Sequence, residues 1–175
     1  MPEEQRDAEE TAKWVTGAGR RALTLPGDIR DERHCQQLIA RAFDELGGLD
    51  ILINNAAFQT THDAIEEFTT DEFDRTLKTN VYAMFWLCRA AVPRMPPGSV
   101  IINTASIQAY DPSANLLAYA ATKGAIVNFT KSLSQLAMKR GIRVNSVAPG
   151  PVWTPLIPST MPGGNSEDVW ARHAV

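Results

Sequence analysis

The chain has 175 residues, a length that suits one domain able to bury a sizeable core. Its apolar and charged fractions, 44% and 21%, exclude an intrinsically disordered protein. The 17 basic and 20 acidic residues give a net charge of −3 without a basic stripe, so nucleic acid is not an expected partner. No run approaches the ~20 apolar residues that span a bilayer, so no membrane partner is expected either.

A charged helical pattern occupies residues 3–15, as is typical of a surface helix. The following string, Thr16 to Arg21, copies the first half of a glycine-rich phosphate loop. It follows a polar helix instead of an apolar strand, however, and it lacks the closing glycine. We therefore interpret it as a helix stop with a glycine cap, followed by a short strand over residues 22–26.

The rest of the chain alternates helices and strands. We expect a turn at 28–31, a helix over 31–46 ended by two glycines, a strand at 49–54, a long helix capped by Thr70 or Asp71 and running to about Val92, a strand at 100–104, a helix over 116–140 and a strand at 143–148. Such alternation predicts a parallel α/β sheet with right-handed crossovers.

The stretch Tyr119-Ala-Ala-Thr-Lys123 is the most informative motif. A tyrosine and a lysine four residues apart lie on one face of a helix, roughly 6 Å from each other. An ammonium group so placed favours the phenolate, and free tyrosine titrates near ~10. The spacing therefore predicts a tyrosine that acts as an acid or a base near neutral pH, with its pKa lowered by Lys123.

Six motifs in order resemble the short-chain dehydrogenase/reductase family, nicotinamide-dependent oxidoreductases on a Rossmann fold. The resemblance runs from about residue 25 to 157 and is carried by Gly27-Asp28-Ile29, Leu52 to Ala57, Thr79-Asn80-Val81, Ser106, Tyr119 with Lys123, and Pro149-Gly150. The strings 55–59 and 150–160 are similar to the bacterial general-stress and uncharacterised oxidoreductase branch. The implied fold is a doubly wound parallel sheet.

The resemblance implies a catalytic tetrad of Asn80, Ser106, Tyr119 and Lys123. Tyr119 would exchange a proton with the substrate oxygen, and Ser106 would hydrogen-bond that oxygen. Lys123 would hold the nicotinamide ribose, and Asn80 would bend its helix and hold a water in a proton relay. The implied reaction interconverts a small-molecule carbonyl and an alcohol by hydride transfer.

The implied cofactor is NAD or NADP, and the sequence does not distinguish them. The residues that the resemblance places on the dinucleotide are Asp28, Ile29, Asn55, Ala56, Ala57, Tyr119, Lys123, Pro149, Gly150, Val152 and Thr154. Ala57 departs from the usual glycine of the family. Gln108, Trp153 and Leu156 are candidates for shaping the substrate pocket.

Relative to this family the chain lacks the opening strand with its glycine-rich turn, and the last strand. Residues 1–175 are thus expected to form a single, partial Rossmann-like domain with a gap in its sheet. The alternative to an enzyme is a truncated, inactive fragment or subunit partner. In the complete form the resemblance implies a dimer or tetramer.

The remaining polar residues predict no metal site. Cys35 and Cys88 have no CxxC partner, which fits a reducing cytoplasm, and the acidic start of the chain is unlike a secretory signal. The three histidines, among them His62, show no ligand spacing and no catalytic partner. We interpret the acidic pairs 66–67 and 71–72 as solvated charges at helix entries.

Overall fold

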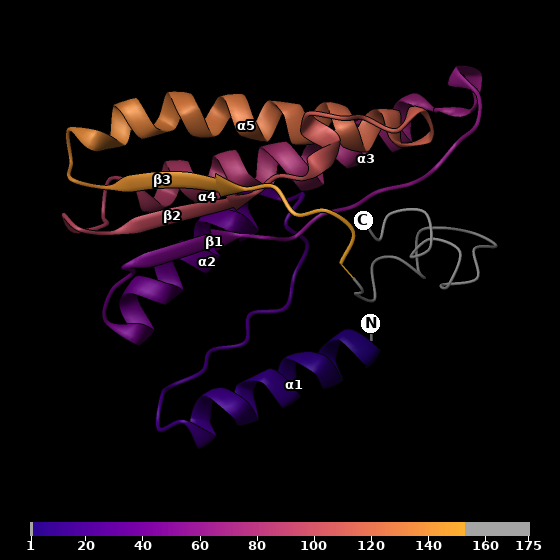
Figure 1. Ribbon diagram of the computed structural model, residues 1–175. Helices are drawn as coiled ribbons and strands as arrows, with labels where there is room; N and C mark the ends of the chain where they lie inside the picture. Colours follow the sequence, from indigo (N-terminus) through magenta and orange to yellow (C-terminus); the bar gives the residue numbers. More distant parts are fainter. Residues whose placement is uncertain (1, 153–175) are drawn as a thin grey trace.

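The computed structural model describes residues 2–152, which build a three-stranded parallel sheet with helices beside it (Figure 1). The strands are Ile51–Asn54 (β1), Val100–Thr104 (β2) and Arg143–Val147 (β3), in the spatial order β1-β2-β3. The register places Leu52 beside Ile101, and Ile101 beside Val144. The parallel α/β architecture predicted from the alternating pattern is confirmed, and it matches an incomplete Rossmann-like sheet.

Five α-helices accompany the strands in the described part of the chain. They are Pro2–Gly17 (α1), Glu32–Leu46 (α2), Thr70–Leu77 (α3), Ala83–Ala91 (α4) and Leu117–Met138 (α5). Short 3₁₀ turns lie at Ile65–Glu67 (η1), Ile107–Ala109 (η3) and Ala114–Leu116 (η4). No helix among residues 2–152 has the length and apolar character needed to cross a bilayer.

The glycine-containing string after α1 ends a helix, as predicted. Gly19 adopts a left-handed conformation with φ 73°, which a residue without a Cβ reaches at no steric cost. Its N–H donates to the Thr16 carbonyl and the Arg20 N–H donates to the Val15 carbonyl, the two bonds of a Schellman motif. The backbone amides of this string are therefore used in closing a helix rather than in cradling a phosphate.

The prediction of a strand at residues 22–26 is wrong, because this segment forms no helix or strand and has no ladder partner. A β-strand needs a neighbour to satisfy its backbone groups, and the sheet of the described residues holds only β1, β2 and β3. The turn at 28–31 is confirmed, and Asp31 caps α2 by accepting from the Arg33 N–H at 2.9 Å.

The long helix predicted to run from Thr70 or Asp71 to Val92 has a different cap, and it is interrupted between α3 and α4. Its cap is Thr69, whose side chain accepts from the Glu72 N–H at 3.2 Å. Between α3 and α4 the backbone widens into a π-helical turn, Lys78–Tyr82 (η2). Such turns occur frequently at functional sites, and this one contains Asn80.

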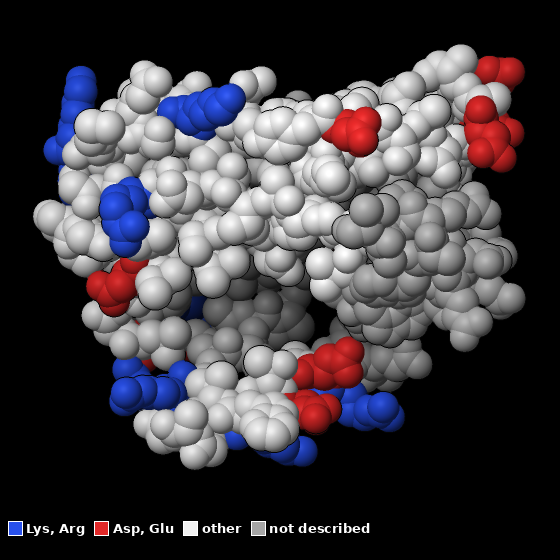
Figure 2. Space-filling view, in the orientation of Figure 1, with Lys and Arg blue, Asp and Glu red and all other residues white. Residues whose placement is uncertain are grey.

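One face of the sheet is covered and the other is open. Leu52, Ile101 and Val144 lie in a core with residues of α2, α4 and α5. Alternate residues of a strand point to opposite faces, and Ile51 and Ile53 are each 60% exposed. On the side of the molecule seen in Figure 2, charged side chains lie over α1, over α5 and at the edges.

This asymmetry predicts unequal costs for two neighbouring substitutions in β1. Leu52, 8% exposed, leaves a cavity when truncated, so Leu52→Ala should lower the free energy of unfolding by about 2–4 kcal/mol. Ile53→Thr keeps a β-branched side chain on the open face and should cost less than about 1 kcal/mol. Urea denaturation of both variants measures the difference, and equal costs would show that both faces are covered.

Candidate active site

Ser106 and Tyr119 meet at the carboxyl edge of the sheet. Ser106 follows β2 by two residues, and Tyr119 lies in the first turn of α5. Both side chains are buried, and the serine hydroxyl lies close enough to the phenol to lower its pKa. Ser106 also caps η3 by accepting from the Gln108 N–H at 3.2 Å, which holds its hydroxyl in place. The predicted serine and tyrosine thus form one site.

Lys123 lies one turn further along α5 and is among the most deeply buried side chains, with 2% exposed. Its Nζ donates to the Thr104 carbonyl at 2.7 Å and lies 5.1 Å from the centroid of the Tyr119 ring. Burial disfavours the charged form and lowers the pKa of the Lys123 ammonium from 10.5 to about 8. The lysine therefore titrates closer to neutrality than a free one.

The electrostatics of Tyr119 differ from the expectation. Burial raises the pKa of the phenol, and the hydrogen bond with Ser106 opposes that rise only in part. The predicted lowering by Lys123 is wrong for this arrangement, because the ammonium donates to the Thr104 carbonyl instead of the phenol oxygen. Tyr119 is consequently held in its protonated form near neutral pH.

Asn80 lies in the π-helical turn and is buried, with 3% exposed. Its Oδ1 accepts from the Phe58 N–H at 2.8 Å, and its Nδ2 donates to the Phe58 carbonyl at 2.9 Å. The same Nδ2 donates to Thr122 Oγ1 at 3.0 Å. The side chain thus joins η2 to α5 and to the segment after β1, while the predicted water relay through Asn80 stays a prediction.

The residues predicted to bind the dinucleotide follow the ends of the parallel strands. Asn55 to Ala57 come after β1, and Pro149 to Val152 come after β3. Asn55 Oδ1 accepts from Thr104 Oγ1 at 3.0 Å, and the Ile107 N–H donates to the Pro149 carbonyl at 3.0 Å. Ligands of open α/β sheets bind at this edge. Thr154, Trp153 and Leu156 lie outside the described residues.

Asp28, predicted to meet the adenine, is exposed and paired with Arg30, whose Nε donates to both of its carboxylate oxygens. These hydrogen bonds lower the pKa of the Asp28 carboxyl to about 2. The charge of Arg75, on α3, adds to that effect. Ile29 is half-buried and its carbonyl accepts from the Cys35 thiol at 3.1 Å. Asp28 is therefore ionised, and both of its carboxylate oxygens are engaged by Arg30, while its predicted contact with the adenine stays a prediction.

The buried ammonium of Lys123 provides a test of whether a dinucleotide fits. An ammonium group has three N–H donors, and within residues 2–152 that of Lys123 donates to the Thr104 carbonyl alone. The two remaining donors match in number the two hydroxyls of a ribose. The residues present therefore fit the nicotinamide riboside half of the cofactor. Among residues 2–152 no cluster of His, Cys, Asp or Glu could hold a metal ion.

Sequence reasoning missed three contributors to this site. Thr104 acts through its backbone carbonyl, and Phe58 acts through both backbone groups, so neither leaves a signal in the residue type. Thr122 bridges Asn80 and the Tyr119 carbonyl, to which its hydroxyl donates at 2.6 Å. Gln108, a pocket candidate, instead binds Ser113 through both ends of its amide.

Sequence reasoning was also wrong about one member of an acidic pair, whereas the other, Asp71, is exposed at the helix entry as expected. Glu72 was expected to be a solvated charge at a helix entry, but its side chain is only 20% exposed and bonds to His62 and Thr60. The three residues come from one continuous stretch of chain, but their contact depends on the path of the loop between them. No periodicity or spacing rule predicts that path.

Comparison with known proteins identifies the family. The family model described as short chain dehydrogenase matches residues 1–163. The chain is 48% identical over 160 residues to the uncharacterized oxidoreductase YhdF of Bacillus subtilis, covering 91% of this chain and 55% of the relative. General stress protein 39 of the same organism is also 48% identical over 160 residues, with 91% and 56% covered.

Among solved structures, a short chain dehydrogenase from Burkholderia cenocepacia in complex with NADP is similar, with a TM-score of 0.86 and 31% identity. The match covers 94% of this chain and 66% of that one. The chain belongs to the short-chain dehydrogenase family. It spans about half the length of the curated relatives it matches.

The buried lysine predicts a pH-dependent contribution to stability. Burial lowers the pKa of Lys123 to about 8, so between that pH and the ordinary pKa of 10.5 the unfolded chain binds more protons than the folded one. The free energy of unfolding contributed by Lys123 therefore rises with pH through this window. Relative to Lys123→Met, the wild type should gain on the order of 1–3 kcal/mol between about pH 7 and about pH 10.

Urea unfolding at both pH values measures this gain. Lys131→Met, which removes an exposed lysine from the same helix, is the matched control and should track the wild type at both pH values. A constant difference between wild type and Lys123→Met would contradict the assigned burial of the charge.

Proposed function

We propose that the protein is an NAD(P)-dependent oxidoreductase that interconverts a carbonyl and an alcohol through Ser106, Tyr119 and Lys123, with Asn80 as the fourth member of the site. The observation that carries the proposal is the buried pair of Ser106 and Tyr119, neighbours at the carboxyl edge of the sheet, with a buried ammonium one helical turn away. Family membership and the parallel sheet support it.

Tyr119 is the proton donor in the direction of reduction. Its raised pKa keeps the phenol protonated near neutral pH, and Ser106 is its neighbour. A substrate carbonyl oxygen placed between the two hydroxyls would accept from both, which stabilises the negative charge that develops on that oxygen. The bound dinucleotide supplies the hydride, and the protein supplies the proton and the orientation.

NAD or NADP would be held along the carboxyl edge. Lys123 would donate to the nicotinamide ribose, Asn55, Ala56 and Ala57 would line the adenosine side, and the Pro149-Gly150 turn with Val152 and Thr154 would face the nicotinamide. Asp28 and Ile29 would contact the adenine. The Burkholderia relative in complex with NADP supports a phosphorylated dinucleotide as one of the two choices.

Exposed apolar side chains and the state of the cysteines bear on the assembly and the location of the protein. Exposed apolar side chains on α4 and α5, such as Phe85 and Leu136, support a dimer or tetramer. Cys35 and Cys88 are both free and buried, which supports a reducing cytoplasm. The substrate is expected to be a small molecule.

The proposal predicts separate effects on binding and on chemistry. Titration of the purified chain with NADH and with NADPH, followed by cofactor fluorescence, should saturate with at least one of them. Lys123→Met should weaken that binding about tenfold or more, because it removes the donors to the ribose. Tyr119→Phe should retain binding and lower kcat for a panel of small aldehydes by at least ~100-fold, the usual share of general acid catalysis.

Tyr110→Phe is the matched control, since Tyr110 is exposed and lies outside the tetrad. It should leave both binding and turnover unchanged. Undiminished turnover in Tyr119→Phe would refute the assigned acid. A chain that binds neither dinucleotide would favour the non-catalytic alternative, a fragment or subunit partner.

A further inference from the structure

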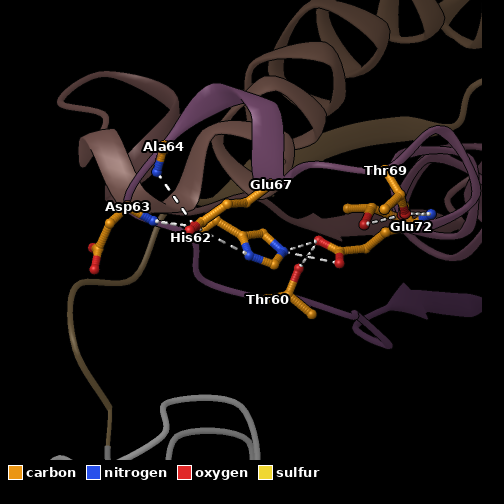
Figure 3. Close-up of polar contacts among 8 residues, drawn as sticks. Thr60, His62, Asp63, Ala64, Glu67, Thr69 and Glu72 are labelled. Atoms are coloured by element: carbon orange, nitrogen blue, oxygen red, sulfur yellow. Dashed lines mark hydrogen bonds and ion pairs between the residues drawn. The ribbon is translucent and has the colours of Figure 1, made fainter.

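A hydrogen-bonded pair outside the tetrad, His62 with Glu72, joins the loop after β1 to the first turn of α3 (Figure 3). His62 Nε2 lies 2.8 Å from Glu72 Oε1 and 2.9 Å from Glu72 Oε2, so the imidazole faces both carboxylate oxygens. The side chains are 24% and 20% exposed, respectively. A pair so shielded is screened less by salt and solvent than an exposed one.

The ionised state of Glu72 decides which side chain of the pair donates the hydrogen bond and which accepts it. The hydrogen bonds from Thr60 and His62 outweigh partial burial and lower the pKa of the Glu72 carboxyl, so this group is ionised and can only accept. His62 Nε2 must therefore carry the proton that it donates. Its other nitrogen, Nδ1, lies 3.8 Å from Glu67 Oε2, beyond hydrogen-bond distance.

Further contacts hold this cluster as one unit. The Thr60 hydroxyl donates to the same carboxylate of Glu72. Glu67 closes the turn before η1 by accepting from the Asp63 N–H at 3.1 Å, and the imidazole packs edge-on against Phe68 with 4.6 Å between ring centroids. In Figure 3 the Thr60, His62 and Glu72 side chains converge on one point.

The cluster is connected to the tetrad at two places. The backbone N–H of His62 donates to the Asn115 carbonyl at 3.1 Å, and Asn115 lies in η4, directly before α5. Tyr119 follows four residues later. At the other end of the same segment, both backbone groups of Phe58 bond to Asn80.

The beginning of α5 has no side-chain cap of its own. The N-cap position, Leu116, makes no side-chain hydrogen bond, and the first turn contains no acidic residue. Ser113, at the cap of η4, makes no capping bond either. An uncapped helix start leaves its first N–H groups without intrahelical partners and tends to fray. Tyr119 is in that first turn.

We infer that His62 and Glu72 form a positioning pair, which holds the turn before α5 and thereby keeps Tyr119 buried against Ser106. The effect of this pair on the position of Tyr119 can be measured without turnover. Its effect on catalysis rests on the proposed function. Neither residue contacts the reacting atoms, so the pair acts through the His62 backbone bond to Asn115 and the start of α5.

The phenol itself can report on this placement without cofactor or substrate. The chain has three tyrosines, so in a Tyr82→Phe/Tyr110→Phe background the phenolate absorbance follows Tyr119 alone. Because burial raises the pKa of Tyr119, a loosened helix start should lower its titration midpoint. His62→Leu in this background should shift the midpoint down by at least about half a unit, toward the ordinary value of ~10.

Amide hydrogen exchange of residues 113–121, measured by mass spectrometry, should accelerate about tenfold or more in the same variant. Glu72→Leu should have the same two effects, and the double variant should be no worse than either single one, since the three variants lose one shared interaction. Arg41→Gln is the matched control, because it breaks the exposed pair with Glu45 on α2 and should change neither readout.

Two further measurements separate positioning from loss of fold. Far-ultraviolet circular dichroism should be the same for all variants; if Leu at position 62 unfolds the chain, His62→Gln, which keeps an N–H donor, should fold with smaller shifts. In an active enzyme, His62→Leu should lower kcat with little change in cofactor Kd. An unchanged Tyr119 midpoint and exchange rate in both single variants, or additive effects in the double variant, would overturn the inference, whatever the outcome of the turnover assays.

Discussion

The contact between the Lys123 ammonium and the Thr104 carbonyl supports the rest of the site. It ties the helix that carries Tyr119 to the strand that leads to Ser106, and it does so with a charged donor buried in the protein. Burying an ammonium costs free energy, which the lowered pKa of Lys123 reflects. A buried ionisable group with a shifted pKa is typical of a functional site. The carboxyl edge of a parallel sheet is where ligands of this architecture bind.

The site is assembled from elements that are distant along the chain. Asn80 joins the π-helical turn to Phe58 and to Thr122, and Thr122 in turn donates to the Tyr119 carbonyl. A buried asparagine whose polar atoms are all bonded to neighbours specifies the relative position of those neighbours. The tyrosine is thus held from three sides, by the serine, by the Asn80 network and by the segment that contains His62.

The sheet that presents this site receives its stability from one face. Parallel strands are normally buried on both faces, but in the described residues only the face toward α2, α4 and α5 carries a core. The short strand expected at residues 22–26 needs a partner strand to form, and β1 has none on its outer edge among residues 2–152. The strand that leads to Ser106 has a partner on each side, because β2 lies between β1 and β3.

Local sequence determined the elements whose signals are local. The alternation of helical and strand patterns predicted α2, α5 and the three strands to within a few residues. The glycines at the ends of α1 and α2 stop those helices as predicted. Helix spacing brought Tyr119 and Lys123 to one face, and order along the chain pointed to Ser106. These features depend on contacts between residues close in sequence or on backbone preferences of single residue types.

Only the tertiary structure decided the pKa shifts of the site residues and the contacts that hold these residues in place. The direction of the Tyr119 pKa shift, the Thr69 cap, the π-helical turn, the missing strand and the pairing of His62 with Glu72 all differ from expectation or were absent from it. Each depends on burial or on backbone groups brought together by packing, and a backbone carbonyl such as that of Thr104 has the same chemistry in every residue. The sequence by itself therefore determined which side chains could do the chemistry, whereas the fold decided what surrounds them and hence their proton affinities.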